Sequence, residues 1–305
     1  GVTSRSRAAQ GTLYGIAAYV IWGTAPLFWQ LLVPAKPMEV LAHRVVWSMV
    51  ILVAMVAIQG RMPHVRAALR DRRTRRLLGI ASVLVGSNWA LFIWATMSGH
   101  VLDAALGYYV VPLLSVALGV VVLKERLRRL QWVSLAISAA GVVYVTVDYG
   151  SLPLIGLGLA VTWAIYGYVK KSAGVDAIES LAIESALLTP FAVVYLGHLA
   201  LTAQGTFGQY GVAHALLMVG AGIFTASPLL LYGAAVVRAP LSTIGFLQYI
   251  SSTIQFGLGV WVFNEPMDAG RLTGFVITWV ALVVLSYDGV RSRRGLPAEA
   301  IADPD

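Results

Sequence analysis

Two ionisable residues, Arg44 and Glu184, stand inside long apolar segments of this 305-residue chain. Charged side chains are costly in such surroundings, so they usually face a cavity or bind a partner. Arg44 could recognise a ligand or act in gating, and Glu184 could take part in proton coupling or gating. Two structural alternatives stay open, because the long stem of Arg44 could reach an interface with water and Glu184 could be a protonated packing residue.

Amide and aromatic side chains form a second group of candidate residues. Gln248 and Gln255 lie on one helix face of a single apolar segment, and a buried amide needs partners that a substrate or water could supply. Aromatic walls with a few polar groups suit a cavity for small organic ligands, although each aromatic residue alone could simply pack. The predicted cavity residues are Arg44, Trp47, Asn88, Trp89, Trp94, Tyr108, Tyr109, Gln248, Tyr249 and Gln255.

The sequence indicates no catalytic centre, metal site or cofactor site. The chain has no Cys, and its five His form neither a His-x-x-x-His nor a His-Glu-x-x-His pattern, which argues against zinc. His43 is the single candidate for a catalytic base, and no nucleophile accompanies it. The chain also lacks the Gly-x-x-x-x-Gly-Lys-Ser/Thr motif, so ATP is not expected to drive the protein directly. We therefore predict that the protein is not an enzyme.

The segments that carry these residues are long enough to cross a lipid bilayer. Hydrophobic residues make up 58% of the chain and charged residues only 12%, against about 25% in soluble domains. A membrane span needs roughly 20 apolar residues, and turn-forming residues separate the apolar runs. We predict an all-α integral membrane protein whose ten transmembrane helices lie at about 12–33, 38–59, 76–98, 101–123, 130–147, 152–169, 177–200, 212–236, 240–263 and 270–288.

The basic residues indicate how the chain is oriented. Nearly all of the 22 Lys and Arg residues fall on alternate linkers, whereas Lys36 and Arg271 fall on the opposite linkers and Arg44 falls within a span. Basic residues favour the cytoplasmic side, so the tails 1–10 and 289–305 are predicted to be cytoplasmic and the protein to be multi-pass in the plasma membrane. Because the net charge of +8 flanks apolar spans, no nucleic acid partner is predicted. The expected partners are membrane lipid and a small-molecule substrate.

The chain resembles itself at an offset near 140 residues. Glu39 matches Glu179, Tyr109 matches Tyr249, and Glu125 matches Glu265 among other colinear pairs. Chance similarity between apolar segments is the alternative explanation. The two units, 11–147 and 152–288, each contain five predicted spans, and an odd number inserts the second unit in the opposite orientation. Inverted repeats of this kind enclose a site near the membrane midplane that can open to either face.

Several motifs are similar to those of the RarD branch of the EamA family, in the drug/metabolite transporter superfamily. They comprise Glu39–Ser48, Asn88–Ala95, Leu106–Leu113, Lys124–Leu127 and Gly245–Ile250, and the resemblance extends from Gly11 to about Tyr287. It implies two inverted five-helix EamA repeats with a central cavity, and a fifth and tenth helix that lie at the periphery and can form a homodimer. The chain departs from the family at Val111, where Asn is common, and at Ser252, where Pro is common.

The combined expectation is a secondary active transporter that moves amino acids, metabolites or drugs by alternating access. Export is the expected direction. Import of a small metabolite, and a receptor or partner subunit that does not transport, stay open as alternatives.

Overall fold

The computed structural model describes residues 2–97, 101–150, 154–262 and 269–294, and these residues form eleven α-helices and no strand. The helices are α1 (Val2–Gln30), α2 (Pro37–Ile58), α3 (Met62–Arg70), α4 (Arg72–Met97), α5 (Val101–Val121), α6 (Arg129–Tyr149), α7 (Leu154–Ala173), α8 (Ala177–Leu201), α9 (Gly211–Val236), α10 (Leu241–Trp261) and α11 (Ala269–Arg294). Within the described ranges, four segments are long and apolar enough to cross a membrane by length and composition: Pro37–Ile58, Arg129–Asp148, Ala177–Leu201 and Gly211–Val236.

Each predicted span falls on one of these helices, and most ends differ by only a few residues. The larger differences are at α1, which begins ten residues before the predicted start at 12, and at α11, which continues to Arg294. The nine-residue helix α3 was not expected, because Arg66 and Arg70, together with the Arg residues on either side of it, indicate only a basic linker. The expectation that Lys170 lies on the linker after the span at 152–169 was wrong: α7 extends to Ala173, and Lys170 is buried in its last turn.

The sequence supplies local reasons for several helix ends. Lipid offers no hydrogen-bond partners, so an apolar segment satisfies its own backbone by forming a helix. Pro37 occupies the first turn of α2, where its missing N–H costs nothing. Gly150 ends α6 in the left-handed conformation, with φ of +72°. The carboxylate of Glu125 accepts the free backbone N–H groups of Leu241 (2.7 Å) and Ser242 (3.0 Å) at the start of α10.

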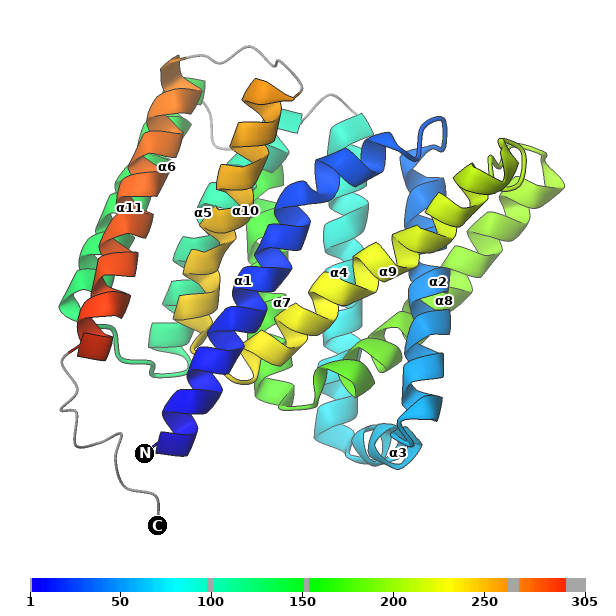
Figure 1. Ribbon diagram of the computed structural model, residues 1–305, viewed down its shortest axis with the longest axis horizontal. Coiled ribbons are helices and arrows are strands. Elements are labelled where there is room, and N and C mark those ends of the chain that lie inside the picture. The colour runs from blue at the N-terminus through cyan, green and yellow to red at the C-terminus, as the bar shows by residue number, and fades with distance from the viewer. Residues whose placement is uncertain (1, 98–100, 151–153, 263–268, 295–305) are drawn as a thin grey trace.

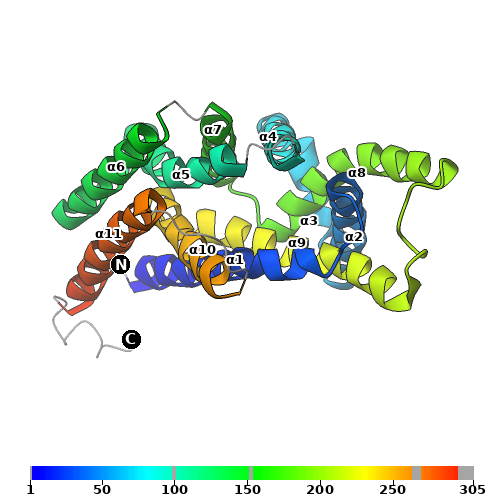
Figure 2. The same ribbon diagram turned by 90° about the horizontal axis from the view of Figure 1, so that it is seen from above.

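The helices run alternately up and down and form two facing rows. Figure 1 shows that the start of α1, the end of α11 and the helix α3 lie at the same end of the bundle. Seen from above, α4, α6 and α7 lie along one row and α1, α9, α10 and α11 along the other, with α2 and α8 at one edge (Figure 2). The pair α6 and α11 occupies the opposite edge.

The helices of the two halves of the chain pack across the bundle on each other. The first helix of the first half, α1, packs against α9 and α10, whereas the first helix of the second half, α7, packs against α4 and α5. The equivalent pairs α2 with α8, α5 with α10, and α6 with α11 are also in contact. The hydroxyl of Ser134 on α6, for example, donates to the carbonyl of Ala281 on α11 at 2.8 Å.

Candidate functional site

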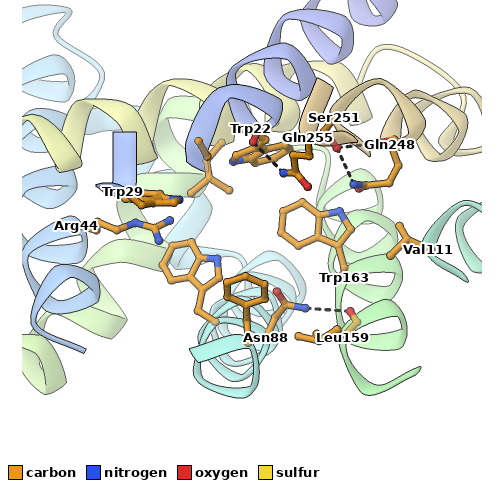
Figure 3. A pocket seen from close by; sticks show the side chains of 14 residues that line it. Trp22, Trp29, Arg44, Asn88, Val111, Leu159, Trp163, Gln248, Ser251 and Gln255 are labelled. Atoms are coloured by element: carbon orange, nitrogen blue, oxygen red, sulfur yellow. Dashed lines mark hydrogen bonds between the residues drawn. The ribbon is translucent and has the colours of Figure 1, made fainter. Parts of the chain in front are cut away.

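A cavity of about 280 Å³ lies between the two rows of helices, and seven helices line it. Its walls are largely aromatic, and one cation and a few amide groups interrupt them (Figure 3). The lining residues are Trp22, Ala25, Trp29, Arg44, Asn88, Trp89, Phe92, Val111, Leu159, Trp163, Leu229, Gln248, Ser251 and Gln255. The volume is near the lower end of small-molecule sites, which span roughly 300–1,000 Å³, so the cavity suits a ligand of metabolite size.

The side chain of Arg44 forms one end of the cavity. Its guanidinium carbon lies 4.6 Å from the ring centre of Trp29 and 5.2 Å from that of Trp89, so both rings make cation–π contacts with it. Its Nε donates a 2.7 Å hydrogen bond to the hydroxyl of Thr225 on α9. Figure 3 shows Arg44 and Trp29 side by side at this end. These contacts hold the guanidinium group in the cavity, so Arg44 does not reach out to the membrane surface.

Three amide side chains line the rest of the cavity, and the NH₂ group of each donates a hydrogen bond to another residue of the protein. Asn88 donates to the carbonyl of Leu159 at 3.0 Å and to the hydroxyl of Thr162 at 2.8 Å. Gln248 donates to the hydroxyl of Ser251 at 3.0 Å, and Gln255 donates to the carbonyl of Trp22 at 3.3 Å. The amide oxygens are therefore the groups left to accept hydrogen bonds from a ligand.

A layer of three Tyr side chains closes the cavity on the side of α3. Tyr19 precedes Trp22 on α1, whereas Tyr166 follows Trp163 on α7, and Tyr232 lies beyond the lining part of α9. Because α7 and α9 run opposite to α1, all three rings lie on the same side of the cavity. Each is at most 2% exposed, and Tyr232 lies 6.3 Å from Tyr19 and 6.1 Å from Tyr166 between ring centres.

Glu184 lies beyond this layer, in a buried polar cluster that does not line the cavity. Its carboxylate accepts from Lys170 Nζ at 2.7 Å, from the Ser180 hydroxyl at 2.8 Å and from the Tyr166 hydroxyl at 2.8 Å. The side chains of both Lys170 and Glu184 are 1% exposed. Tyr166 thus connects the closing layer of the cavity to a buried ion pair, which the sequence did not indicate because Lys170 looks like a linker residue.

Two clusters of contacts join loops to helix ends on opposite sides of the bundle. Glu39, at the start of α2, accepts the backbone N–H of Thr206 at 2.5 Å and that of Phe207 at 3.3 Å, in the loop between α8 and α9. Glu179, at the start of α8, accepts from Arg61 at 3.3 Å, in the turn between α2 and α3. Each half of the chain therefore holds a loop of the other half.

The structure brings together Arg44, Asn88, Trp89, Gln248 and Gln255 of the predicted cavity residues. It places Trp47 outside the lining, where the indole donates to the His43 ring at 3.2 Å, and it buries Tyr249 in a cluster with Val116 and Phe246. The side chains of Trp94, Tyr108 and Tyr109 lie outside the described residues.

Several lining residues are not among the ten predicted cavity residues. Trp22 and Trp163 occupy matching positions in the two halves of the chain, and this match was the available signal for both. Trp29 lies two helical turns after Trp22, and Ser251 lies one turn after Gln248, so helical spacing from a known lining residue also points to them. Val111, which stands where the resembling family often has Asn, lines the cavity as well.

The model of the family described as "EamA-like transporter family" matches residues 9–147. "Protein RarD" of Streptomyces exfoliatus is 45% identical over 93% of this chain and 90% of its own length. An "Uncharacterized transporter" of Vibrio cholerae is 40% identical over 93% of this chain and 94% of its own. A solved crystal structure, 17% identical, matches 91% of this chain and 97% of that chain with a TM-score of 0.67, so the two share a fold.

The apolar helices and the matching relatives agree on an integral membrane protein. The chain belongs to the EamA-like transporter family of the drug/metabolite transporter superfamily, among relatives that include RarD proteins.

Proposed function

We propose that the protein is a secondary transporter that moves small organic solutes across the plasma membrane by alternating access. The observation that carries the proposal is the cavity between the two rows, which has aromatic walls and polar groups and is closed by Tyr19, Tyr166 and Tyr232 on the side of α3. A transporter needs a site of this kind that is closed toward one face while a ligand binds from the other. Export stays the predicted direction.

The packing of the helices supports two inverted five-helix repeats, 11–147 and 152–288. Exchanging the two halves turns the contacts of α1 with α9 and α10 into those of α7 with α4 and α5. The same exchange relates Glu39, which holds the loop between α8 and α9, to Glu179, which holds the turn after α2. Two such arrangements of the same halves would open the cavity to opposite faces.

The α3 end of the bundle is the proposed cytoplasmic end. The Arg residues of α3, the start of α1 and the end of α11 all lie at this end. Basic residues favour the cytoplasmic side of a membrane. In this orientation the tyrosine layer closes the cavity toward the cytoplasm. A homodimer through α6 and α11 stays a prediction.

Filling the cavity is expected to abolish transport. Ala25 is 8% exposed and lines the cavity, so Ala25→Phe places a ring in the ligand space. The assay measures the entry of four solutes into proteoliposomes by counterflow: L-tyrosine, tyramine, 3-(4-hydroxyphenyl)propionate and chloramphenicol. At least one solute should enter faster than into protein-free liposomes, and Ala25→Phe should reduce its entry to that background.

The matched control is Val53→Phe on α2, where the side chain is 48% exposed on the outer surface of the bundle. This variant should transport like the unchanged protein. Entry of every solute at the background rate in the unchanged protein would contradict the proposed function, and binding without flux would instead support a receptor.

Alternating access predicts that one cavity position can be reached from either face. Because the chain has no Cys, Gln255→Cys introduces a single thiol into the cavity. A membrane-impermeant maleimide should label this thiol in right-side-out vesicles and also in inverted vesicles. Ser134→Cys, which is 0% exposed between α6 and α11, should stay unlabelled in both. Labelling of Gln255→Cys from one face only would contradict the mechanism.

A further inference from the structure

The cavity carries a positive charge that the described residues do not neutralise. Arg44 is the one charged residue among those described as lining it. In the described part of the chain, the ion pairs join other residues, and no carboxylate lies within ion-pair distance of Arg44. A ligand that brings a negative charge would therefore complete the site.

The geometry around Arg44 leaves the guanidinium group ready to bind such a charge. An Arg side chain has five N–H donors, and among the residues that the structure describes only Nε has an acceptor, the hydroxyl of Thr225. The rings of Trp29 and Trp89 contact the guanidinium group and restrict its orientation. Four N–H groups on the two Nη atoms remain without a hydrogen bond to a described residue. Their planar fork matches a carboxylate, which it can bind through two parallel hydrogen bonds.

The other parts of the cavity indicate the rest of the ligand. The walls formed by Trp22, Trp89 and Trp163 favour a flat apolar body. The oxygens of the three cavity amides accept hydrogen bonds, so they suit a hydroxyl group on that body. An ammonium group on the ligand would add a second positive charge to the cavity that already holds Arg44, and the described lining holds no carboxylate to compensate it.

We infer that the cavity binds an organic anion, namely an aryl-substituted alkanoate whose carboxylate is held by the guanidinium fork of Arg44 and which has no ammonium group. This inference names the substrate class of the proposed transporter and rests on that function only for the movement of the ligand, not for its binding.

Matched probes that share one phenol ring test the charge of the ligand. Calorimetry on the purified full-length protein in detergent would compare 3-(4-hydroxyphenyl)propionate with its amide, with tyramine and with L-tyrosine. The acid should bind about ten- to a hundredfold more tightly than the neutral amide, as expected for a charge-assisted hydrogen-bond pair. It should also bind more tightly than L-tyrosine, which adds only an ammonium group, and tyramine should bind most weakly.

Two substitutions test whether Arg44 provides the preference. Arg44→Gln should remove the advantage of the acid over the amide. Arg44→Lys keeps the charge but loses the fork, so it should bind the acid more weakly while still preferring it to the amide. Two results would show that the cavity is still folded in these variants: Arg44→Lys still binds the acid, and Arg44→Gln binds the amide as tightly as the unchanged protein does.

The inference is overturned if the amide, tyramine or L-tyrosine binds as tightly as the acid, if no probe binds, or if Arg44→Gln keeps the preference. These results are separable from those on transport. Counterflow of tyramine or chloramphenicol that Ala25→Phe abolishes, without binding of the acid, would leave the proposed function standing and refute the anion site. Binding of the acid through Arg44 without any counterflow would support the anion site and refute the proposed transport function.

Discussion

Replacing Lys170 alone by Met is expected to lower the free energy of unfolding by about 3–5 kcal/mol, because it leaves a buried carboxylate without its counter-charge. In the structure Lys170 Nζ lies 2.7 Å from Glu184, and both side chains are 1% exposed. The hydroxyls of Tyr166 and Ser180 would remain as the donors to Glu184. The measurement is denaturant unfolding of the purified protein in detergent, followed by tryptophan fluorescence.

Removing both charges should restore most of the lost stability. Lys170→Met with Glu184→Gln leaves a neutral amide whose oxygen can accept from one of the Tyr166 and Ser180 hydroxyls and whose NH₂ group can donate to the other. Arg126→Met, at an exposed position, serves as the control for loss of a basic residue. An unchanged unfolding free energy in Lys170→Met would contradict the importance of the ion pair.

The double variant also tests the prediction that Glu184 takes part in proton coupling or gating. If its carboxyl group carries the coupled proton, the folded double variant should lose the dependence of transport on the pH gradient. If that dependence persists, Glu184 and Lys170 have a structural role, and the coupling prediction fails.

Gly222→Ala is the second substitution with a large expected effect. At this position α9 approaches α2 so closely that an added Cβ would contact the Cβ of Trp47 and lie 2.7 Å from the Trp47 carbonyl carbon. The Ser48 hydroxyl also donates to the Gly222 carbonyl, at 3.1 Å. Backbone atoms cannot yield as a flexible side chain can, so we expect a loss of about 1–3 kcal/mol or more in the free energy of unfolding.

Gly220→Ala, two residues earlier on the same helix, is the matched control. A Cβ at Gly220 would meet only the ring of Phe28, at 4.0 Å, which is an ordinary contact. This variant should be at least as stable as the unchanged protein, because Ala favours a helix more than Gly does. Equal unfolding free energies for the two variants would show that the close approach of α2 and α9 contributes nothing to stability.

The periodic and apolar parts of the chain were predictable, whereas contacts between distant segments were not. Runs of apolar residues predicted the positions of the long helices in the described part of the chain, because the length and composition of a segment are local properties. The helix α3 was not predicted, because a short segment with Arg residues is also typical of a basic linker, although its residues form an amphipathic pattern. Arg44 was identified because it interrupts an apolar run, and Gln248 and Gln255 because an amide is unusual at such depth.

The partners of these residues depend on packing between the halves. Thr225 lies 181 residues from Arg44, and the proximity of the two could not be inferred from either segment alone. Lys170 was misplaced for the same reason, since only the tertiary structure buries the last turn of α7. Trp29 was missed because a Trp near a helix end is equally typical of a membrane interface.

The packing of α1 on α9 and α10 has a consequence for synthesis. The ribosome completes α1 long before it begins α10 at Leu241. At about 5–20 residues per second, the delay is on the order of ten to forty seconds. During that interval α1 lacks its neighbour α10, and the face that carries Gly15 and Gly23, which packs on Leu247 and Ile254 of α10, stays uncovered. Nascent chains that stop before α10 should therefore be the forms that proteases and insertion chaperones of the membrane recognise.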